Sequence, residues 1–205
     1  MSERQHLSAK ERRERTVETV VTLCSEEEPA TLTTGRIAQR MGVTQGALFR
    51  HFPNKDAIWA AVVAWVTDQV MARVGAAAEA AEDPLAALEA MFLAHVAFIA
   101  EHPGVPRLLM AQLQHPRPTI ASRMVRGLMK RYQRRLLGLL EEARRQGRLR
   151  PGLDLDAAAT QFIGCLQGLV MQSLIADDVA SIGERAPAAF ELYRHGIRTT
   201  VGGDA

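Results

Sequence analysis

Apolar residues recur at intervals of three and four along nearly the whole chain, and this spacing constrains the fold more than any other feature. An α-helix repeats every 3.6 residues, whereas a strand alternates every two, so the spacing predicts helices. The 205 residues contain no Asn-Gly or Asp-Gly pair, the usual signal of a tight hairpin turn. The sequence therefore predicts an all-α fold of about nine helices and no strand.

Prolines and capping residues divide this pattern into separate helices. Ser8 and Glu11 have the spacing of a capping box, and the Glu28-Pro29 pair ends the helix that they begin. Other side chains placed to cap helices are Thr33, Thr44, Asn54, Asp83 and Asp154. The predicted helices cover residues 8–27, 33–41, 44–49, 55–81, 83–101, 106–114, 119–147, 154–175 and 182–201.

Composition and motifs exclude several classes of protein. Apolar residues make up 47% and charged residues 23%, which is typical of a globular chain. No apolar run approaches a membrane span, and the charged N-terminal residues do not form a signal peptide, so a cytoplasmic location and no membrane partner are expected. The chain lacks a phosphate-binding glycine loop, a His-Glu-x-x-His motif and a Gly-x-Ser-x-Gly motif. We therefore expect neither an enzyme nor a bound cofactor.

Few residues could hold a metal. Cys24 and Cys165 lie far apart and fit neither a disulfide framework nor a four-ligand zinc site. A site built from His95, His102 and Cys165 after folding is disfavoured, because no two histidines have the i, i+4 spacing of helical ligands. No metal site is predicted.

The net charge of +2 hides two basic segments. Residues 31–55 contain four Arg and Lys side chains and no acid, a local charge of +4. Residues 116–151 contain eleven basic side chains and two acids, a local charge of +9. Such segments can bind polyanions, although a charge run is more commonly a solvated helix face.

Residues 33–52 have the pattern of a helix-turn-helix. Gly42 permits the positive φ of a tight turn between two short amphipathic helices, and Val43 is expected to fill the angle between them. Ile37, Leu48 and Phe52 supply a local apolar core. The outward face of the second helix is small or hydrogen-bonding and carries no acid, which suits a helix that enters the major groove of DNA.

The same stretch closely resembles the DNA-binding signature of the TetR family of bacterial transcription regulators. The matching residues are Ile37-Ala38, Met41-Gly42-Val43-Thr44, the run from Gly46 to Phe52, and Lys55. The match covers about 25 residues, and the helix count and chain length also agree with the family. The alternative is a buried helical pair in an unrelated α-protein. In that case the polar residues from Gln45 to Lys55 would have to be buried, or they would form an acid-free surface that has no explanation.

The resemblance implies roles for individual residues of this stretch. Thr33 and Thr34 would cap the first short helix and offer donors to a phosphate, and Thr44 would also meet the phosphate backbone. Gln45 would form a bidentate pair with adenine. Gly46 and Ala47 would allow close approach, with His51 and Lys55 holding phosphates on the flank. The predicted DNA-binding residues are Thr33, Thr34, Thr44, Gln45, Gly46, Ala47, Phe49, Arg50, His51 and Lys55.

Two positions depart from the family pattern. The family usually has tyrosine where this chain has Phe49, and Phe49 lacks the hydroxyl that would donate one hydrogen bond to a phosphate. The first helix also ends at Glu26-Glu27-Glu28-Pro29, where the family commonly has a glycine.

Residues 56–205 would form the ligand-binding and dimerisation domain, with residues 1–55 as the DNA-binding domain. In the family, the middle helices enclose a small-molecule site, although Met and Phe at helical spacing are more often plain core. His95 and Gln114 stand out, because polar groups in apolar surroundings need a partner. The candidate ligand-binding residues are Trp65, Phe92, His95, Phe98, Met110, Gln114, Met124, Leu128, Phe162 and Met171.

Residues 156–175 mix small and large apolar side chains, which favours close helix packing. Together with the last helix, they resemble the surface through which family members form homodimers.

The basic segment from Arg117 to Arg150 allows two interpretations. Its charges could be balanced by acids on neighbouring helices. Alternatively, Arg123, Arg126 and Lys130 could form a rim that holds an anionic ligand, such as the phosphates of an acyl-coenzyme A.

The resulting prediction is a repressor that binds a palindromic operator in double-stranded DNA as a dimer. A small-molecule effector would release the repressor from the operator. This effector is expected to be apolar or amphipathic, and it would carry an anionic group if the basic rim binds it. The alternative is a structural or interaction protein, or a DNA binder without a small-molecule ligand.

Overall fold

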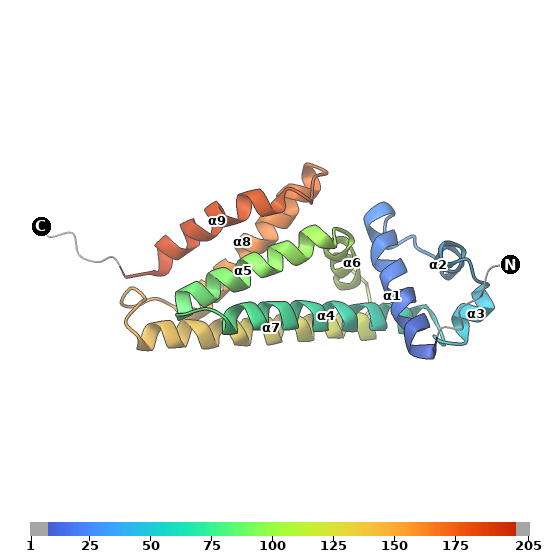
Figure 1. Cartoon of the computed structure of the whole chain (residues 1–205), viewed down its shortest axis with the longest axis horizontal. Coiled ribbons are helices and arrows are strands. Elements are labelled where there is room, and N and C mark those ends of the chain that lie inside the picture. Colours follow the sequence, from blue (N-terminus) through green and yellow to red (C-terminus); the bar gives the residue numbers. More distant parts are fainter. Residues whose placement is uncertain (1–7, 200–205) are drawn as a thin grey trace, which may run out of the picture. The chain divides into compact units, whose positions relative to one another are not determined.

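The computed structural model describes residues 8–199, and Figure 1 follows their helices along the chain. Within that range the chain forms nine α-helices and no strand, which confirms the predicted fold class. A single antiparallel bridge joins Leu149 to Arg198. The helices are α1 (Ala9–Glu26), α2 (Thr34–Met41), α3 (Gln45–Phe49), α4 (Lys55–Glu79), α5 (Pro84–Glu101), α6 (Gly104–Leu113), α7 (Ile120–Arg145), α8 (Leu155–Ile175) and α9 (Ile182–Ile197).

Local side-chain caps begin most of these helices where the sequence predicts. The Ser8 hydroxyl accepts a hydrogen bond from the Glu11 amide at 3.2 Å, and the Glu11 carboxylate accepts one from the Ser8 amide at 2.6 Å. Asn54, Asp83 and Asp154 each accept a hydrogen bond from a backbone amide in the first turn of the next helix. Helix α9 ends at Ile197, before the predicted residue 201, which lies outside the described residues.

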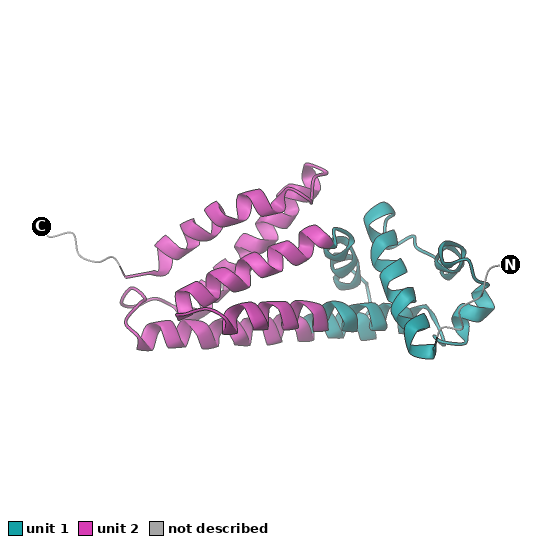
Figure 2. Cartoon of the chain, in the orientation of Figure 1, with its two compact units in different colours: residues 1–67, 102–126 teal, residues 68–101, 127–205 magenta. Residues whose placement is uncertain are grey.

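The described residues fold into two compact units, coloured separately in Figure 2. Unit 1 contains the chain up to Thr67 together with His102–Arg126. Unit 2 contains Asp68–Glu101 and the chain from Gly127 onward. Helices α4 and α7 each run from one unit into the other. The predicted division at residues 55/56 separates the residues expected to bind DNA from those expected to bind a ligand. It is a division by function, so it stays a prediction.

In unit 1, helix α6 lies directly against the backbone of α1. A Cβ atom placed on Gly104 would lie 2.5 Å from the Val21 carbonyl oxygen and 2.6 Å from the Ser25 nitrogen. Both distances are shorter than a carbon can approach, and backbone atoms cannot rotate away. Only glycine therefore allows this approach.

Unit 2 is organised around a cluster of aromatic side chains. Phe162 of α8 lies 5.3 Å from Phe92 of α5 and 5.5 Å from Tyr193 of α9, measured between ring centroids. Both pairs have edge-to-face geometry, which aromatic rings prefer. Phe190 and Tyr132 complete the cluster, and all five rings are buried.

Three helices are more apolar than the sequence analysis recognised. Helices α4, α5 and α8 are long and apolar enough to cross a membrane, judged by length and composition alone. In the sequence, isolated polar residues such as Asp68 in α4, Glu89 in α5 and Gln167 in α8 interrupt the apolar runs, although the mean hydropathy of each helix remains high. Of the most apolar 18 residues of each helix, 44% are buried in α4 and α5 but only 28% in α8.

Candidate nucleic-acid interface

Helices α2 and α3 form the predicted helix-turn-helix in unit 1. The Thr33 hydroxyl accepts a hydrogen bond from the Arg36 amide, and the Thr44 hydroxyl accepts one from the Ala47 amide, each at 3.1 Å. Gly42 ends α2 with φ of +67°, as predicted. The apolar residues predicted for the local core, Ile37, Leu48 and Phe52, are all buried.

Two local expectations about this motif are wrong. The Val43 side chain does not fill the angle between α2 and α3, because 41% of it is exposed. Its backbone amide instead reaches back to the Ala38 carbonyl, as part of the left-handed turn at Gly42. Thr33 alone caps α2, and Thr34 is the first residue of the helix.

The outward face of α3 is open to solvent. Thr44, Gln45, Gly46 and Arg50 are exposed, and no side chain other than Thr44 comes within 4 Å of a Cβ placed on Gly46. Phe49 is also 41% exposed, an unusual position for a large apolar ring. This face combines a hydrogen-bonding amide, a cation, an apolar ring and little bulk, which are the properties that contact with base edges and sugars requires.

The Gln45 side chain is oriented by the neighbouring helix. Its amide nitrogen donates a hydrogen bond to the Thr34 hydroxyl of α2 at 2.6 Å. The amide nitrogen has two N–H donors, and the bond to Thr34 uses one of them. A bidentate pair with adenine needs one N–H and the amide oxygen, so the bond to Thr34 leaves enough groups for that pair.

Arg13 of α1 is a residue that sequence reasoning missed. Its guanidinium donates a hydrogen bond to the His51 carbonyl oxygen at 2.6 Å and lies 4.4 Å from the centre of the Phe52 ring. It thereby ties α1 to the segment that carries His51 and leads to Lys55. Arg13 and His51 are 38 residues apart, so no local pattern could have indicated this contact.

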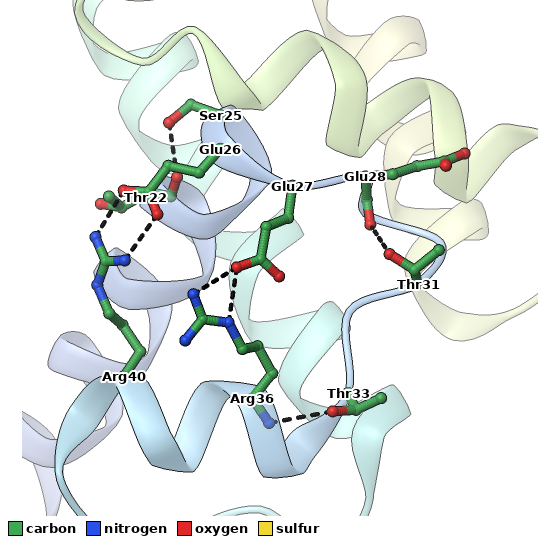
Figure 3. Close-up of polar contacts among 9 residues, drawn as sticks. All are labelled: Thr22, Ser25, Glu26, Glu27, Glu28, Thr31, Thr33, Arg36 and Arg40. Atoms are coloured by element: carbon green, nitrogen blue, oxygen red, sulfur yellow. Dashed lines mark hydrogen bonds and ion pairs between the residues drawn. The ribbon is translucent and has the colours of Figure 1, made fainter.

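The positive charge of this region is smaller than the sequence indicates. Arg36 binds Glu27, and Arg40 binds Glu26 with two parallel hydrogen bonds of 2.7 and 2.6 Å. Figure 3 shows both guanidinium groups extending from α2 to carboxylates at the end of α1. The four basic residues of 31–55 are therefore not equivalent, because acids just outside that segment neutralise two of them.

Comparison with known proteins agrees with this geometry. Residues 20–62 match the bacterial regulatory proteins of the tetR family, and residues 84–190 match the tetracyclin repressor-like C-terminal domain. The chain belongs to the tetR family. It is accordingly a DNA-binding transcription regulator, and its family consists of regulators, not enzymes.

Sequence relatives include the nucleoid occlusion factor SlmA from Aliivibrio fischeri and from Vibrio cholerae. The Aliivibrio fischeri protein is 27% identical over 146 residues, which is 70% of this chain and 74% of the relative. The Vibrio cholerae protein is 26% identical over 160 residues, which is 77% of this chain and 81% of the relative.

Solved structures share the fold at low sequence identity. FadR from Bacillus subtilis, in complex with stearoyl-CoA, has a TM-score of 0.79 and 19% identity, covering 90% of this chain and 99% of that one. The ketosteroid regulator KstR2 of Mycobacterium tuberculosis has a TM-score of 0.73 and 18% identity, covering 92% and 96%. These similarities establish the tetR-family fold for this chain.

The candidate ligand-binding residues are distributed over both units. In unit 2, the His95 Nδ1 atom lies 3.0 Å from the Tyr132 hydroxyl, beside the ring cluster that includes Phe92 and Phe162. Burial lowers the pKa of His95 to about 4, so its ring is neutral at pH 7. Phe98 and Leu128 are buried in the same unit, whereas Met171 is 42% exposed on α8.

The remaining candidates lie in unit 1. Trp65 contacts the His102 ring edge-on, with centroids 5.2 Å apart, and Met124 is part-buried on α7. Met110 of α6 and Gln114, the residue that follows this helix, line a groove of about 630 Å³ with residues 26–30. No group of three metal-ligating side chains occurs within residues 8–199.

The basic segment of α7 is partly balanced by nearby acids. Arg135 binds Glu79 and the Gly75 carbonyl oxygen, both on α4, at 3.0 Å. Arg144 and Arg145 pair with acids one turn earlier on α7 itself. The first interpretation, balance by acids on neighbouring helices, therefore holds for Arg135, whereas Arg144 and Arg145 are balanced within α7. The side chains of the predicted anionic rim, Arg123, Arg126 and Lys130, are all exposed.

Proposed function

We propose that this regulator is a repressor that binds a near-palindromic operator as a homodimer and is released by a small-molecule inducer. The observation that carries the DNA-binding part is the exposed, acid-free face of α3, positioned by the Thr44 cap and the turn at Gly42. Two copies would place two such faces in successive major grooves. A protein that acts on DNA in this way would work in the cytoplasm.

Within this proposal, Gln45 reads a base and the residues around it hold the backbone. Gly46 and Ala47 leave room beside the bases, and the Ala47 methyl group suits contact with a thymine methyl. Thr33, Thr34, Thr44, His51 and Lys55 contact phosphates, with Arg50 near them. The Phe49 ring lacks the hydroxyl of the family tyrosine, so it would pack on sugar or thymine methyl groups instead.

The apolar faces of α8 and α9 support a homodimer. Ile175 is 72% exposed on α8 and Leu192 is 78% exposed on α9, values that are unusual for large apolar side chains. The low burial of α8 within the chain has the same explanation, since a second copy would cover it. Size measurement by light scattering should give twice the chain mass of 22.5 kDa, and I175E with L192E should shift it to a monomer.

Polar groups inside unit 2 support an effector with an apolar body and a polar group. The buried Tyr193 hydroxyl has no hydrogen-bond partner within residues 8–199, and the His95–Tyr132 pair lies in the same aromatic cluster. Such groups are natural contacts for a ligand. The neighbour FadR was solved with stearoyl-CoA, which combines an apolar chain with anionic phosphates.

The anionic part of this proposal rests on Arg123, Arg126 and Lys130. Stearoyl-CoA, decanoate and a neutral long-chain alcohol would be added to the protein bound to its operator. If an anionic head group is recognised, stearoyl-CoA should release DNA and the alcohol should not. Reversing the three charges to glutamate should abolish the response without changing operator affinity. An unchanged response would exclude this rim.

DNA recognition is tested by selecting sequences from a random pool with the wild-type protein and measuring binding by gel shift. The selected duplex should bind at least roughly a thousandfold more tightly than random DNA. Q45A should relax the preference at one base pair, at a cost of about 1–3 kcal/mol. K55A should instead weaken binding to every sequence alike and lower the salt dependence by about one phosphate contact. Equal loss of specificity in both variants would contradict the assigned roles.

The sequence relatives favour a second candidate function. Both are nucleoid occlusion factors by name, and they match more than two thirds of this chain. A protein of that kind would be a DNA binder without need of a small-molecule inducer. Mapping the bound sites across the chromosome separates the two: a repressor should occupy a few promoters, and an occlusion factor should occupy many dispersed sites.

A further inference from the structure

We propose that Glu26 and Glu27 are positioning residues for DNA recognition, which hold α2 in place under α3 and keep Arg36 and Arg40 from DNA phosphates. This inference rests on the proposed DNA binding by α3. It assigns a role to the acidic end of α1, where the tetR family commonly has a glycine.

The geometry of the two ion pairs is specific. Arg40 forms a two-bond fork with both carboxylate oxygens of Glu26, at 2.7 and 2.6 Å. Arg36 directs two of its nitrogens to a single oxygen of Glu27, at 2.7 and 2.6 Å. Hydrogen bonds from Arg40 lower the pKa of Glu26, so this pair stays ionised at neutral pH. The next acid, Glu28, has no ion pair among the described residues.

Helix α2 has few other anchors. It has eight residues, of which only Ile37 and Ala38 are buried. The two ion pairs attach its exposed side to α1 at points one helical turn apart, which resists both rotation and sliding. A bidentate arginine–carboxylate fork also restricts direction more than a single contact does.

The position of α2 determines how the reading residue is presented. Thr34, the first residue of α2, holds the Gln45 amide through its hydroxyl. Gly42 at the end of α2 leads directly into the Thr44 cap of α3. A change in the orientation of α2 would therefore move both the Gln45 side chain and the start of α3.

The same pairs limit binding to DNA of any sequence. An unpaired arginine close to a DNA-binding face adds a phosphate contact, which raises affinity without adding sequence information. Because Arg36 and Arg40 are held by carboxylates, they contribute little to this indiscriminate attraction. Specific binding then depends on the residues of α3.

The test compares E26Q/E27Q with wild type on two probes: the duplex selected by the wild-type protein and a random-sequence duplex of equal length. The matched control is E18Q/E28Q. It changes the charge of the same part of the chain equally, and neither Glu18 nor Glu28 has an ion pair among residues 8–199. Thermal unfolding of every variant accompanies the binding measurements. Each single variant is measured as well, so that the result does not depend on the double variant folding.

We expect E26Q/E27Q to lower the ratio of specific to random binding about tenfold relative to the control. On random DNA, its salt dependence should steepen by up to about 1.8, corresponding to two additional phosphate contacts. Two charge exchanges, E26R/R40E and E27R/R36E, restore the pairs without changing net charge, and they should return the ratio to within about threefold of wild type.

A ratio and salt slope equal to those of the control would overturn the inference, as would charge exchanges that fail to restore the ratio. The wild-type protein alone decides the proposed function, through its preference for the selected duplex. The salt slope on random DNA needs no operator, so it decides the role of the ion pairs separately.

Discussion

The helices that carry the candidate interface combine a buried apolar core with partly exposed polar links, whereas unit 2 is organised around packed aromatic rings. Around α2 and α3 the links are the Arg13–His51 hydrogen bond and the arginine–glutamate pairs. In unit 2, five buried rings lie against one another around Phe162. Polar links that are partly exposed contribute little stability but fix direction, whereas buried rings contribute stability. Changes in the first region should therefore alter DNA binding, and changes in the second should alter folding.

The largest effect expected from this difference is the loss of the central ring. F162A should lower the free energy of unfolding by about 3–5 kcal/mol, because it removes contacts with four neighbouring rings and leaves a cavity. Urea unfolding at fixed protein concentration measures it. K130A, an exposed change in the same unit, should cost less than about 0.5 kcal/mol. If F162A and K130A lowered the free energy of unfolding by similar amounts, aromatic packing would not be what stabilises unit 2.

A substitution at Gly104 tests whether disturbing a packing contact in unit 1 costs as much stability as disturbing one in unit 2. G104A should destabilise the protein by about 3 kcal/mol, because the new methyl group meets the backbone of α1. Gly138 in α7 is the matched control, since nothing lies within 4 Å of a Cβ placed there. G138A should be neutral or stabilising by up to about 1 kcal/mol. If both substitutions stabilise the protein, α1 and α6 are not in close contact in solution.

The pH dependence of stability should report on the interior of unit 2. The folded-state pKa of His95 is about 4, below the ordinary value of 6.5, so the unfolded chain binds more protons between these values. Stability from this group is complete above pH 6.5 and is lost as the pH falls toward 4. Wild type should lose about 2 kcal/mol more than H95Q between pH 7 and pH 5. Parallel pH profiles for the two would show that His95 is solvated.

Apart from the control variants, the smallest effect on stability is expected at Arg13. R13A should cost about 1 kcal/mol, because a partly exposed hydrogen bond and a cation–π contact are lost. Binding to the selected duplex should weaken about fivefold, since the segment with His51 loses its support. R13K keeps the charge but not the planar fork, so it should resemble R13A. Wild-type affinity in R13K would indicate that only the charge of Arg13 matters.

Features set by neighbouring residues were predictable from the sequence. The capping side chains Ser8, Thr44, Asp83 and Asp154 begin helices at the expected places, because a cap needs only the next three residues. The turn at Gly42 was predictable for the same reason. The outward face of α3 follows from helical spacing, so most of the candidate interface could be assigned before the structure was known.

Features set by tertiary packing were not predictable. In the sequence, Glu26 and Glu27 stand out only as a departure from a glycine, because nothing local indicates that Arg36 and Arg40 lie opposite them. For the same reason, the sequence overstates the basic character of residues 31–55. Val43 has the residue type of an interior position, but the left-handed turn at Gly42 leaves it exposed.

The contact between Gly104 and α1 has a consequence for how this protein can be divided into modules. Unit 1 is discontinuous in sequence, because α6 and the start of α7 belong to it. A fragment ending at Thr67 would keep α1, α2 and α3 but would uncover the α1 backbone from Val21 to Ser25, which Gly104 now covers. Fusing this DNA-binding region to another ligand-binding domain therefore requires residues 102–126 as well. Exchange of the N-terminal segment alone would leave the backbone of α1 exposed where Gly104 normally packs.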